Sequence, residues 1–510
     1  MSGSILKSAF IIVAVTMVGR LLGLIRNMFL TNQFGTGMES TAYTAAFTIP
    51  LALSLVVPGA VNSILIPTLK GKIIDGDEAG ANALFHKVLT ALTVFFIVLT
   101  VVIFVFADPI ISLMVPSFSE ETHRLTVELF RYMAPSALFI GLFSLFSSVL
   151  NVHNEFFIAS LGTVVNSLIV IVSYYVFVPF MEIQGLALGT LLGFVGFALV
   201  MVPALRRFHY SIGLNLRLND PEMKAMGERL IPIVIGSTIS QLTMFLERFF
   251  ASGIGEAKLT VLTLANQIMQ VPMAVFVGAF TLPLFPLLAE YVKKQQMDQM
   301  KHVLEQGLLY LVILLLPVTV GLILLSAEIT ALFYERGEFG PADTALTAWA
   351  LIFYSLGILG LAFRDLFTRA FYAMEDTKTP VMLGAGAIVL YVLFVNLFIP
   401  LLDHGGIAFA ASLSAFCNAM ALAFLLRRKV GSKLLSSSFY VSTGKAVVAS
   451  TGMGLIVWLG KLLLAGIPLW LSVPFIIAAG AGVYLLILLL LKEELAKEML
   501  AKVKRKTSRA

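Results

Sequence analysis

Long apolar segments separated by short polar ones make up most of the chain. A helix that crosses a membrane needs about 20 mostly apolar residues, and several apolar runs exceed this length, which indicates tilt or extension beyond the bilayer. The pattern predicts an all-α polytopic membrane protein with fourteen transmembrane helices. The predicted spans are 8–31, 41–69, 84–115, 125–150, 156–180, 184–205, 226–252, 257–292, 302–333, 342–373, 379–402, 405–426, 443–466 and 470–491.

Composition agrees with this pattern. Of the 510 residues, 59% are hydrophobic and 13% are charged, whereas soluble domains are roughly 45–50% apolar and about 25% charged. The single cysteine, Cys417, lies in an apolar run and excludes an intrachain disulfide. Lys7 precedes the first apolar run as in a signal peptide, but no small-residue cleavage site follows, so we expect an uncleaved first span.

The distribution of Lys and Arg predicts the orientation. With the N-terminus inside the cell, 25 of the 35 Lys and Arg residues fall in inner segments and four in outer segments. Positive residues are enriched on the cytoplasmic side of membrane proteins, so both termini are predicted to be cytoplasmic. The basic tail, 493–510, would then meet the anionic lipids of the inner leaflet.

An internal repeat relates the two halves of the chain. "GAVNSILIPTL" (59–69) resembles "GAFTLPLFPLL" (278–288), and Arg26 upstream corresponds to Arg248. Chance similarity between apolar helices is the alternative. The repeat predicts two parallel six-helix lobes, 1–207 and 226–430, with two extra helices in 443–492. In such transporters the substrate site lies between the repeats, around a central cavity near the membrane midplane.

Two arginines interrupt the first predicted span. An arginine at the centre of a span costs about 2.5–3.5 kcal/mol on insertion scales, and the first half offers Arg20 no obvious intramembrane carboxylate. Arg26 lies about 9 Å further along the helix, where it either shares a binding role or anchors the helix at the outer interface. Gly19 and Gly23 would let the backbone approach a neighbour closely. Because the guanidinium fork suits phosphate, the arginines predict a phosphate-bearing substrate.

The second half carries charged neighbours, Glu247–Arg248 and Arg364–Asp365. Adjacent residues on a helix do not face each other, so we expect each charge to pair with a group on another span. Glu247 and Arg364 are one candidate pair, and a structural ion pair that ties spans 226–252 and 342–373 together is as plausible as a binding role.

Three amides form a further candidate group, Asn266, Gln267 and Gln270, of which the first and last share a helix face. They either bind a polar headgroup or link helices to each other.

Motifs of soluble enzymes are absent from the sequence. It contains no G-x-x-x-x-G-K loop, no H-E-x-x-H motif and no zinc-type spacing of Cys and His. It also lacks a sizeable soluble domain. We therefore expect a protein that is not an enzyme and that binds no nucleic acid and no metal.

Three stretches make the chain resemble a known family: "GRLLGLIRNMFLTNQFGTGMESTAY" (19–43), "LFYERGEFGPADT" (332–344) and "FYAMEDTKTPV" (371–381). They resemble the MurJ/MviN family of lipid II flippases, within the MATE-like exporter superfamily, and the resemblance runs through the whole chain in order. It implies two six-helix lobes around a central cationic cavity. It also implies that the two extra helices form a groove for a polyprenyl tail.

The resemblance implies a substrate and a mechanism. Undecaprenyl-diphosphate carrying the peptidoglycan disaccharide-pentapeptide would move from the inner to the outer leaflet of the bacterial cytoplasmic membrane by alternating access. Arg20 and Arg26 match the family's two cavity arginines. Glu247 falls where an acidic residue contributes to a cation site, and Asn396 is a weaker candidate. A coupling monovalent cation or the membrane potential is expected, in a monomer near cell-wall synthesis proteins.

The chain departs from the family pattern at several charged positions. It has Asn27 and Thr41 where the family has acidic residues, and Leu53 or Ser54 where the family has an arginine. The three amides at 266–270 replace an Asp-Arg pair and a Glu. These departures leave open a flippase for another polyprenyl-diphosphate-linked glycan, of a capsule, a teichuronic polymer or an exopolysaccharide. A MATE-type exporter of cationic drugs would need carboxylates in the first lobe, and a scaffold would not need Arg20.

Overall fold

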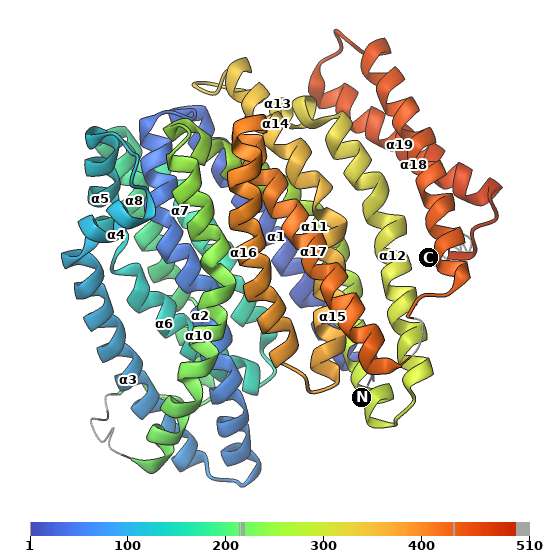
Figure 1. Ribbon diagram of the computed structural model, residues 1–510. Coiled ribbons are helices and arrows are strands. Elements are labelled where there is room, and N and C mark those ends of the chain that lie inside the picture. Colours follow the sequence, from blue (N-terminus) through green and yellow to red (C-terminus); the bar gives the residue numbers. More distant parts are fainter. Residues whose placement is uncertain (1, 214, 216–219, 432–433, 496–510) are drawn as a thin grey trace. The chain divides into compact units, whose positions relative to one another are not determined.

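The computed structural model describes residues 2–213, 215, 220–431 and 434–495, without the side chains of 2–14, 16, 279, 280, 282 and 283. Within these ranges the chain forms nineteen α-helices and no strand (Figure 1). Thirteen helical stretches are long and apolar enough to cross a membrane, and they match the predicted spans from 41–69 onward. The prediction of an all-α polytopic membrane protein is confirmed. The predicted tail lies outside the described residues from 496 on.

The chain divides into two compact units, 1–260 and 261–510. The predicted lobes, 1–207 and 226–430, and the predicted pair 443–492 remain predictions. The helices of the first unit are α1 (Ser2–Phe34), α2 (Met38–Ile74), α3 (Glu78–Val105), α4 (Ala107–Met114), α5 (Glu120–Met133), α6 (Ser136–Val152), α7 (Phe156–Val176), α8 (Val178–Leu199), α9 (Val202–Arg207) and α10 (Pro221–Ser252).

Helix α11 (Glu256–Lys293) begins in the first unit and continues into the second. The other helices of the second unit are α12 (Met297–Leu324), α13 (Ser326–Tyr334), α14 (Pro341–Leu356), α15 (Ile358–Ala373), α16 (Lys378–Leu402), α17 (His404–Val430), α18 (Ser437–Leu463) and α19 (Leu469–Leu490).

The predicted repeat is visible in the order of the helices. The series α2 to α8 and the series α11 to α17 have the same succession of long and short helices. The predicted spans 84–115 and 302–333 each break into a long helix and a short one, at Phe106 and at Leu325. Sequence reasoning missed both breaks, although Asp108 and Glu328 stand in the first turns of the helices that follow.

Backbone angles support the repeat independently. Glu182 near the start of α8 has φ 50° and ψ −132°, and Asp403 before α17 has φ 54° and ψ −134°. Asn154 and Glu375, which precede α7 and α16, also have positive φ values. An L-residue with a positive φ is uncommon outside Gly, Asn and Asp. Matching strain at matching turns is therefore difficult to obtain by chance.

Several helices begin at capping residues. The side chains of Asp77, Ser119 and Ser436 accept hydrogen bonds from backbone N–H groups at the starts of α3, α5 and α18. Such caps satisfy N–H groups that have no partner within the helix. They fix where these membrane helices start, which the apolar pattern leaves uncertain by several residues.

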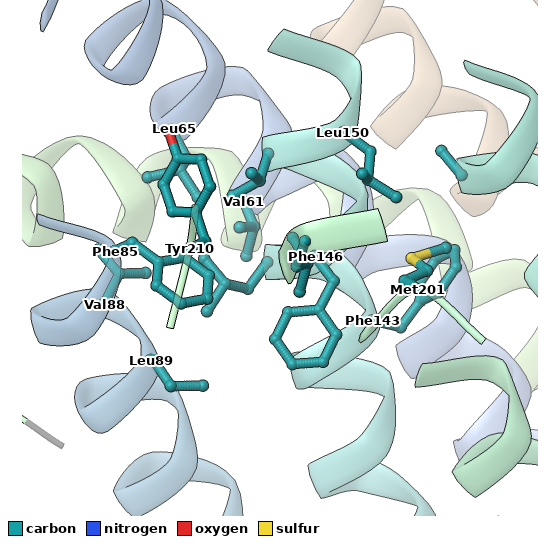
Figure 2. Close-up of a cluster of buried hydrophobic side chains, with 14 of the residues drawn as sticks. Val61, Leu65, Phe85, Val88, Leu89, Phe143, Phe146, Leu150, Met201 and Tyr210 are labelled. Carbon is teal, nitrogen blue, oxygen red and sulfur yellow. The ribbon is translucent and has the colours of Figure 1, made fainter. Parts of the chain in front are cut away.

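A cluster of buried side chains joins α2, α3 and α6 in the first unit (Figure 2). Phe85 on α3 lies 5.2 Å from the Tyr210 ring and 6.4 Å from the Phe146 ring, measured between centroids. Because lipid is as apolar as these side chains, close packing rather than removal from water holds such helices together. This cluster holds α2, α3 and α6 together within the first unit.

In the second unit, α18 and α19 pack on each other, and α18 also packs on α12. The Tyr484 hydroxyl on α19 donates a 2.7 Å hydrogen bond to the carbonyl oxygen of Ile313 on α12. Lys461 on α18 pairs with Glu328 on α13 at 2.8 Å. These polar contacts attach the two C-terminal helices to the rest of their unit.

Candidate functional site

The predicted site residues fall in both units. Arg20, Arg26 and Glu247 belong to the first unit. The second unit holds Asn266, Gln267, Gln270, Arg364 and Asn396.

Arg20 lies on α1 with an exposed side chain. Among the described residues, no carboxylate lies within ion-pair distance of its guanidinium. The preceding Gly19 lets α1 approach α7 closely, because a Cβ at this position would lie 3.2 Å from the Thr163 Oγ1. The expected close approach of α1 to a neighbour is therefore confirmed at Gly19. This packing holds α1 against α7, and the neighbouring Arg20 guanidinium can bind an anion.

Arg26 is held more tightly than Arg20. Its guanidinium carbon lies 4.9 Å from the centroid of the Phe47 ring on α2. Its Nε is buried and has no hydrogen-bond partner among the described residues. The Nε therefore lies inside the protein, and the alternative of Arg26 as an anchor at the outer interface stays a prediction. A buried donor without an acceptor is costly, and a ligand oxygen would satisfy it.

Aromatic side chains surround Arg26. Phe47 stacks on Tyr43 at 6.0 Å between ring centroids, and the Tyr43 hydroxyl lies 2.8 Å from the Thr190 Oγ1 on α8. The Tyr174 hydroxyl on α7 donates a 3.4 Å hydrogen bond to the Arg26 carbonyl oxygen. Sequence analysis did not select these residues. The spacing of Tyr43 and Phe47, four residues apart on one helix face, was the available signal.

Arg248, the repeat counterpart of Arg26, has a different environment. Its side chain is buried, and its Nη1 lies 3.7 Å from the Glu247 Oε1. Its Nε donates a 3.3 Å hydrogen bond to the Thr48 hydroxyl on α2. Glu247 thus has a cation on its own helix, which the sequence analysis did not expect, and a partner on another span stays a prediction. The carboxylate proposed for a cation site thus already faces an arginine.

The two repeat-related arginines reach α2 at consecutive residues. Arg26 contacts Phe47, and Arg248 contacts Thr48. Both side chains therefore approach the same turn of α2 from different helices. The Glu247 carboxylate compensates the charge of Arg248, whereas the guanidinium of Arg26 lies against the Phe47 ring.

The amides of α11 lie at intermediate depth. Asn266, Gln267 and Gln270 are all half-buried in the second unit. Asn266 and Gln270 have no hydrogen-bond partner among the described residues, whereas Gln267 interacts with another group. The shared face of Asn266 and Gln270 is consistent with a role in binding a polar headgroup.

Arg364 on α15 has an exposed side chain. Its neighbour Asp365 pairs with Arg369 at 3.0 Å, one turn further along the same helix. The expectation that Asp365 pairs with a group on another span is therefore wrong. Arg369 serves as the counter-ion of Asp365. Arg364 is therefore left to bind another negatively charged group.

Asn396 on α16 is the weaker of the two candidates for a cation site. Its side chain is exposed, and its amide donates a 2.8 Å hydrogen bond to the Val392 carbonyl oxygen of the same helix. This bond uses the amide nitrogen and leaves the side-chain oxygen as a possible cation ligand.

Comparison with known proteins connects this geometry to a family. The sequence profile of the lipid II flippase MurJ matches residues 30–478. A probable lipid II flippase MurJ of Rickettsia prowazekii is 27% identical over 462 residues, which is 90% of each chain. One of Vibrio cholerae is 26% identical over 515 residues, covering 96% of this chain and 97% of the relative.

Solved structures agree on the fold. A lipid II flippase MurJ in an inward closed conformation superimposes with a TM-score of 0.81 at 21% identity, covering 95% of this chain and 99% of that one. An inward-facing MATE multidrug transporter of the MOP superfamily superimposes with a TM-score of 0.69 at 17% identity, over 83% of this chain and 98% of that one. With the profile match over most of its length, this chain belongs to the MurJ family of lipid II flippases.

Proposed function

We propose that this protein moves lipid II, the undecaprenyl-diphosphate-linked peptidoglycan precursor, from the inner to the outer leaflet of the bacterial cytoplasmic membrane. The family profile and the curated relatives support this substrate. The substrate-binding role is assigned to Arg20 and Arg26 because their positive charges are not compensated within the described part of the protein. Neither has a carboxylate partner among the described residues, and Arg26 has a buried Nε without an acceptor.

The substrate brings the negative charge that these arginines lack. A diphosphate presents two adjacent anionic groups, and a guanidinium donates two parallel hydrogen bonds to such a group. Arg26 is pre-oriented by the Phe47 ring, so less side-chain entropy is lost when it binds. Arg20, with its exposed side chain, adapts to the headgroup. The polyprenyl chain remains in apolar surroundings while the headgroup crosses within the protein.

Direction and energy source complete the proposal. Both termini lie in the cytoplasm, as the Lys and Arg bias predicts. A monovalent cation at Glu247, or the membrane potential, biases the protein between inward-facing and outward-facing states. A ligand shifts such an equilibrium only by the difference in its affinities for the two states. The protein acts as a monomer near cell-wall synthesis proteins and catalyses no covalent reaction.

The test is genetic replacement followed by reconstitution. This chain should sustain growth and normal cell shape in a bacterium whose essential lipid II flippase has been depleted. Purified protein in proteoliposomes should move lipid II between leaflets. Failure of both, with transport of a different polyprenyl-diphosphate-linked glycan, would replace lipid II by that glycan as the substrate.

A further inference from the structure

An apolar groove of about 730 Å³ lies in the first unit between α2, α3 and α10. Its walls are apolar except for Asp220, Lys224, Thr238 and Gln241, all at or on α10. Neither Arg20 nor Arg26 lines it. α10 forms one wall of the groove and packs on α2 at its C-terminal end. None of the residues in its most apolar 18-residue stretch is buried.

Ion pairs close one end of the groove, where α10 begins. Lys72 on α2 lies 3.2 Å from Glu222, and Lys87 on α3 pairs with Asp220. The hydrogen bond from Lys87 lowers the pKa of Asp220, so this carboxylate stays ionised and its charge is compensated. Lys224, which lines the same end, is exposed and has no carboxylate partner among the described residues.

The lining indicates a hydrocarbon occupant. A cavity of this size with apolar walls holds neither a stable water cluster nor empty space in a membrane. The uncompensated Lys224 lies at the end predicted to face the cytoplasm, so the occupant carries an anionic group there. An anionic lipid has both features.

The length of the groove distinguishes between lipids. Met223 and Phe245 both line it, and along α10 they are separated by about 33 Å at the usual rise per residue. The hydrocarbon core of a bilayer is about 30 Å thick, so an ordinary acyl chain, confined to one leaflet, reaches only about half that distance. A polyprenyl chain is long enough to occupy the whole groove.

We propose that this groove holds the polyprenyl chain of the transported lipid, with its diphosphate beside Lys224 before the headgroup enters the arginine site. The proposal rests on the proposed function. It adds a chain-binding site in the first unit to the tail groove that the family resemblance implies for α18 and α19 in the second. A groove that spans both leaflets would hold the chain while the headgroup changes sides.

The experiment places a photoreactive benzoylphenylalanine at Phe245, at the far end from Lys224. Protein in phosphatidylcholine nanodiscs is irradiated with added undecaprenyl diphosphate, which carries no glycan, and mass spectrometry identifies the adduct. Gly227→Phe is the blocking variant, because Gly227 lines the groove and has open space around its Cβ position. Gly236→Phe is the matched control on α10, with equal space but outside the lining.

We expect an undecaprenyl adduct that falls about tenfold in Gly227→Phe, since displacing two methylene groups changes affinity by roughly that factor. It should stay unchanged in Gly236→Phe. Lys224→Glu, at an exposed position, should lower it as well. A phosphatidylcholine adduct alone, or an undecaprenyl adduct insensitive to both Gly227→Phe and Lys224→Glu, would overturn the proposal.

The adduct forms without transport, so the two proposals fail separately. If the adduct depends on the groove but the protein flips no diphosphate lipid, the proposed function is refuted and the chain-binding site is supported. If Gly227→Phe flips lipid II normally and its adduct is unchanged, the chain-binding site is refuted and the proposed function is supported.

Discussion

Arg26 offers the sharpest test of the phosphate site, because its surroundings separate charge, geometry and ring contact. Arg26→Lys keeps the positive charge and loses the planar guanidinium that donates two parallel hydrogen bonds. Arg26→Ala removes both. Phe47→Leu keeps the arginine and removes the ring face that lies 4.9 Å from its guanidinium carbon. Each change removes a different part of the proposed interaction with the diphosphate.

The expected losses follow from the contacts. Arg26→Lys forfeits one charge-assisted hydrogen bond, worth about 1.5–3 kcal/mol, which weakens binding roughly 10-fold to 150-fold. Arg26→Ala leaves the phosphate without this cation, at a cost of about 2–5 kcal/mol. Phe47→Leu removes a cation–π contact of about 0.5–2 kcal/mol. The predicted order of impairment is therefore Ala, then Lys, then the Phe47 variant.

The assay is the Kd of lipid II in nanodiscs, together with flipping in proteoliposomes at matched protein amounts. Arg131→Lys is the control, because Arg131 also lies over a ring, that of Phe104 at 5.6 Å, but outside the candidate site. It should bind normally. If Arg26→Lys binds lipid II as well as the natural protein does, the bidentate reasoning is refuted. If Arg26→Ala also does, Arg26 serves only to hold α1 on α2.

Three further predictions concern orientation, coupling and stability. With Cys417 replaced by serine, a cysteine at the exposed Ser119 should react with an impermeant thiol reagent outside whole cells. One at Asp75 should not, and the reverse pattern would invert the proposed direction. Glu247→Gln should reduce transport and abolish any cation-dependent conformational change, whereas normal transport under every gradient would leave Glu247 a structural partner of its neighbouring arginine. The hydrogen bond from Lys429 lowers the pKa of Asp376 from 3.8 to about 2. The stability that Asp376 contributes is therefore complete above about pH 4 and lost as the pH falls through about 2. Asp376→Asn should lower the melting temperature at pH 7 slightly and leave it unchanged near pH 2.

Length and apolarity predicted the membrane spans from 41–69 onward, because lipid demands continuous helices of nearly fixed length. The breaks at Phe106 and Leu325 were not predictable in this way. Both positions are apolar, but Asp108 and Glu328 follow them in the first turns of α4 and α13, and acidic residues there are a signal for a helix start that length and apolarity ignore. The repeat supplies a further signal, since a break in one half predicts a break at the equivalent turn of the other.

Candidate charges were located from the sequence, but their partners were not. The rule that adjacent residues on a helix point apart failed for Glu247 and Arg248 because two long side chains bend back toward each other. It failed for Asp365 because Arg369, one turn away, was available. Ring contacts such as that of Phe47 depend on how α1 packs against α2, and no local pattern encodes that packing.

The repeat therefore placed equivalent arginines on α1 and α10, and their surroundings make them chemically different. Arg248 is buried against Glu247 and Thr48, so its charge is satisfied without a ligand. Ile25 occupies the position next to Arg26 that Glu247 occupies next to Arg248, and no described carboxylate pairs with Arg26. A cation without a carboxylate partner is costly within a membrane, and an anionic ligand would lower that cost. Under the proposed function, this asymmetry between two positions of common origin separates a structural arginine from one that binds the diphosphate of the substrate.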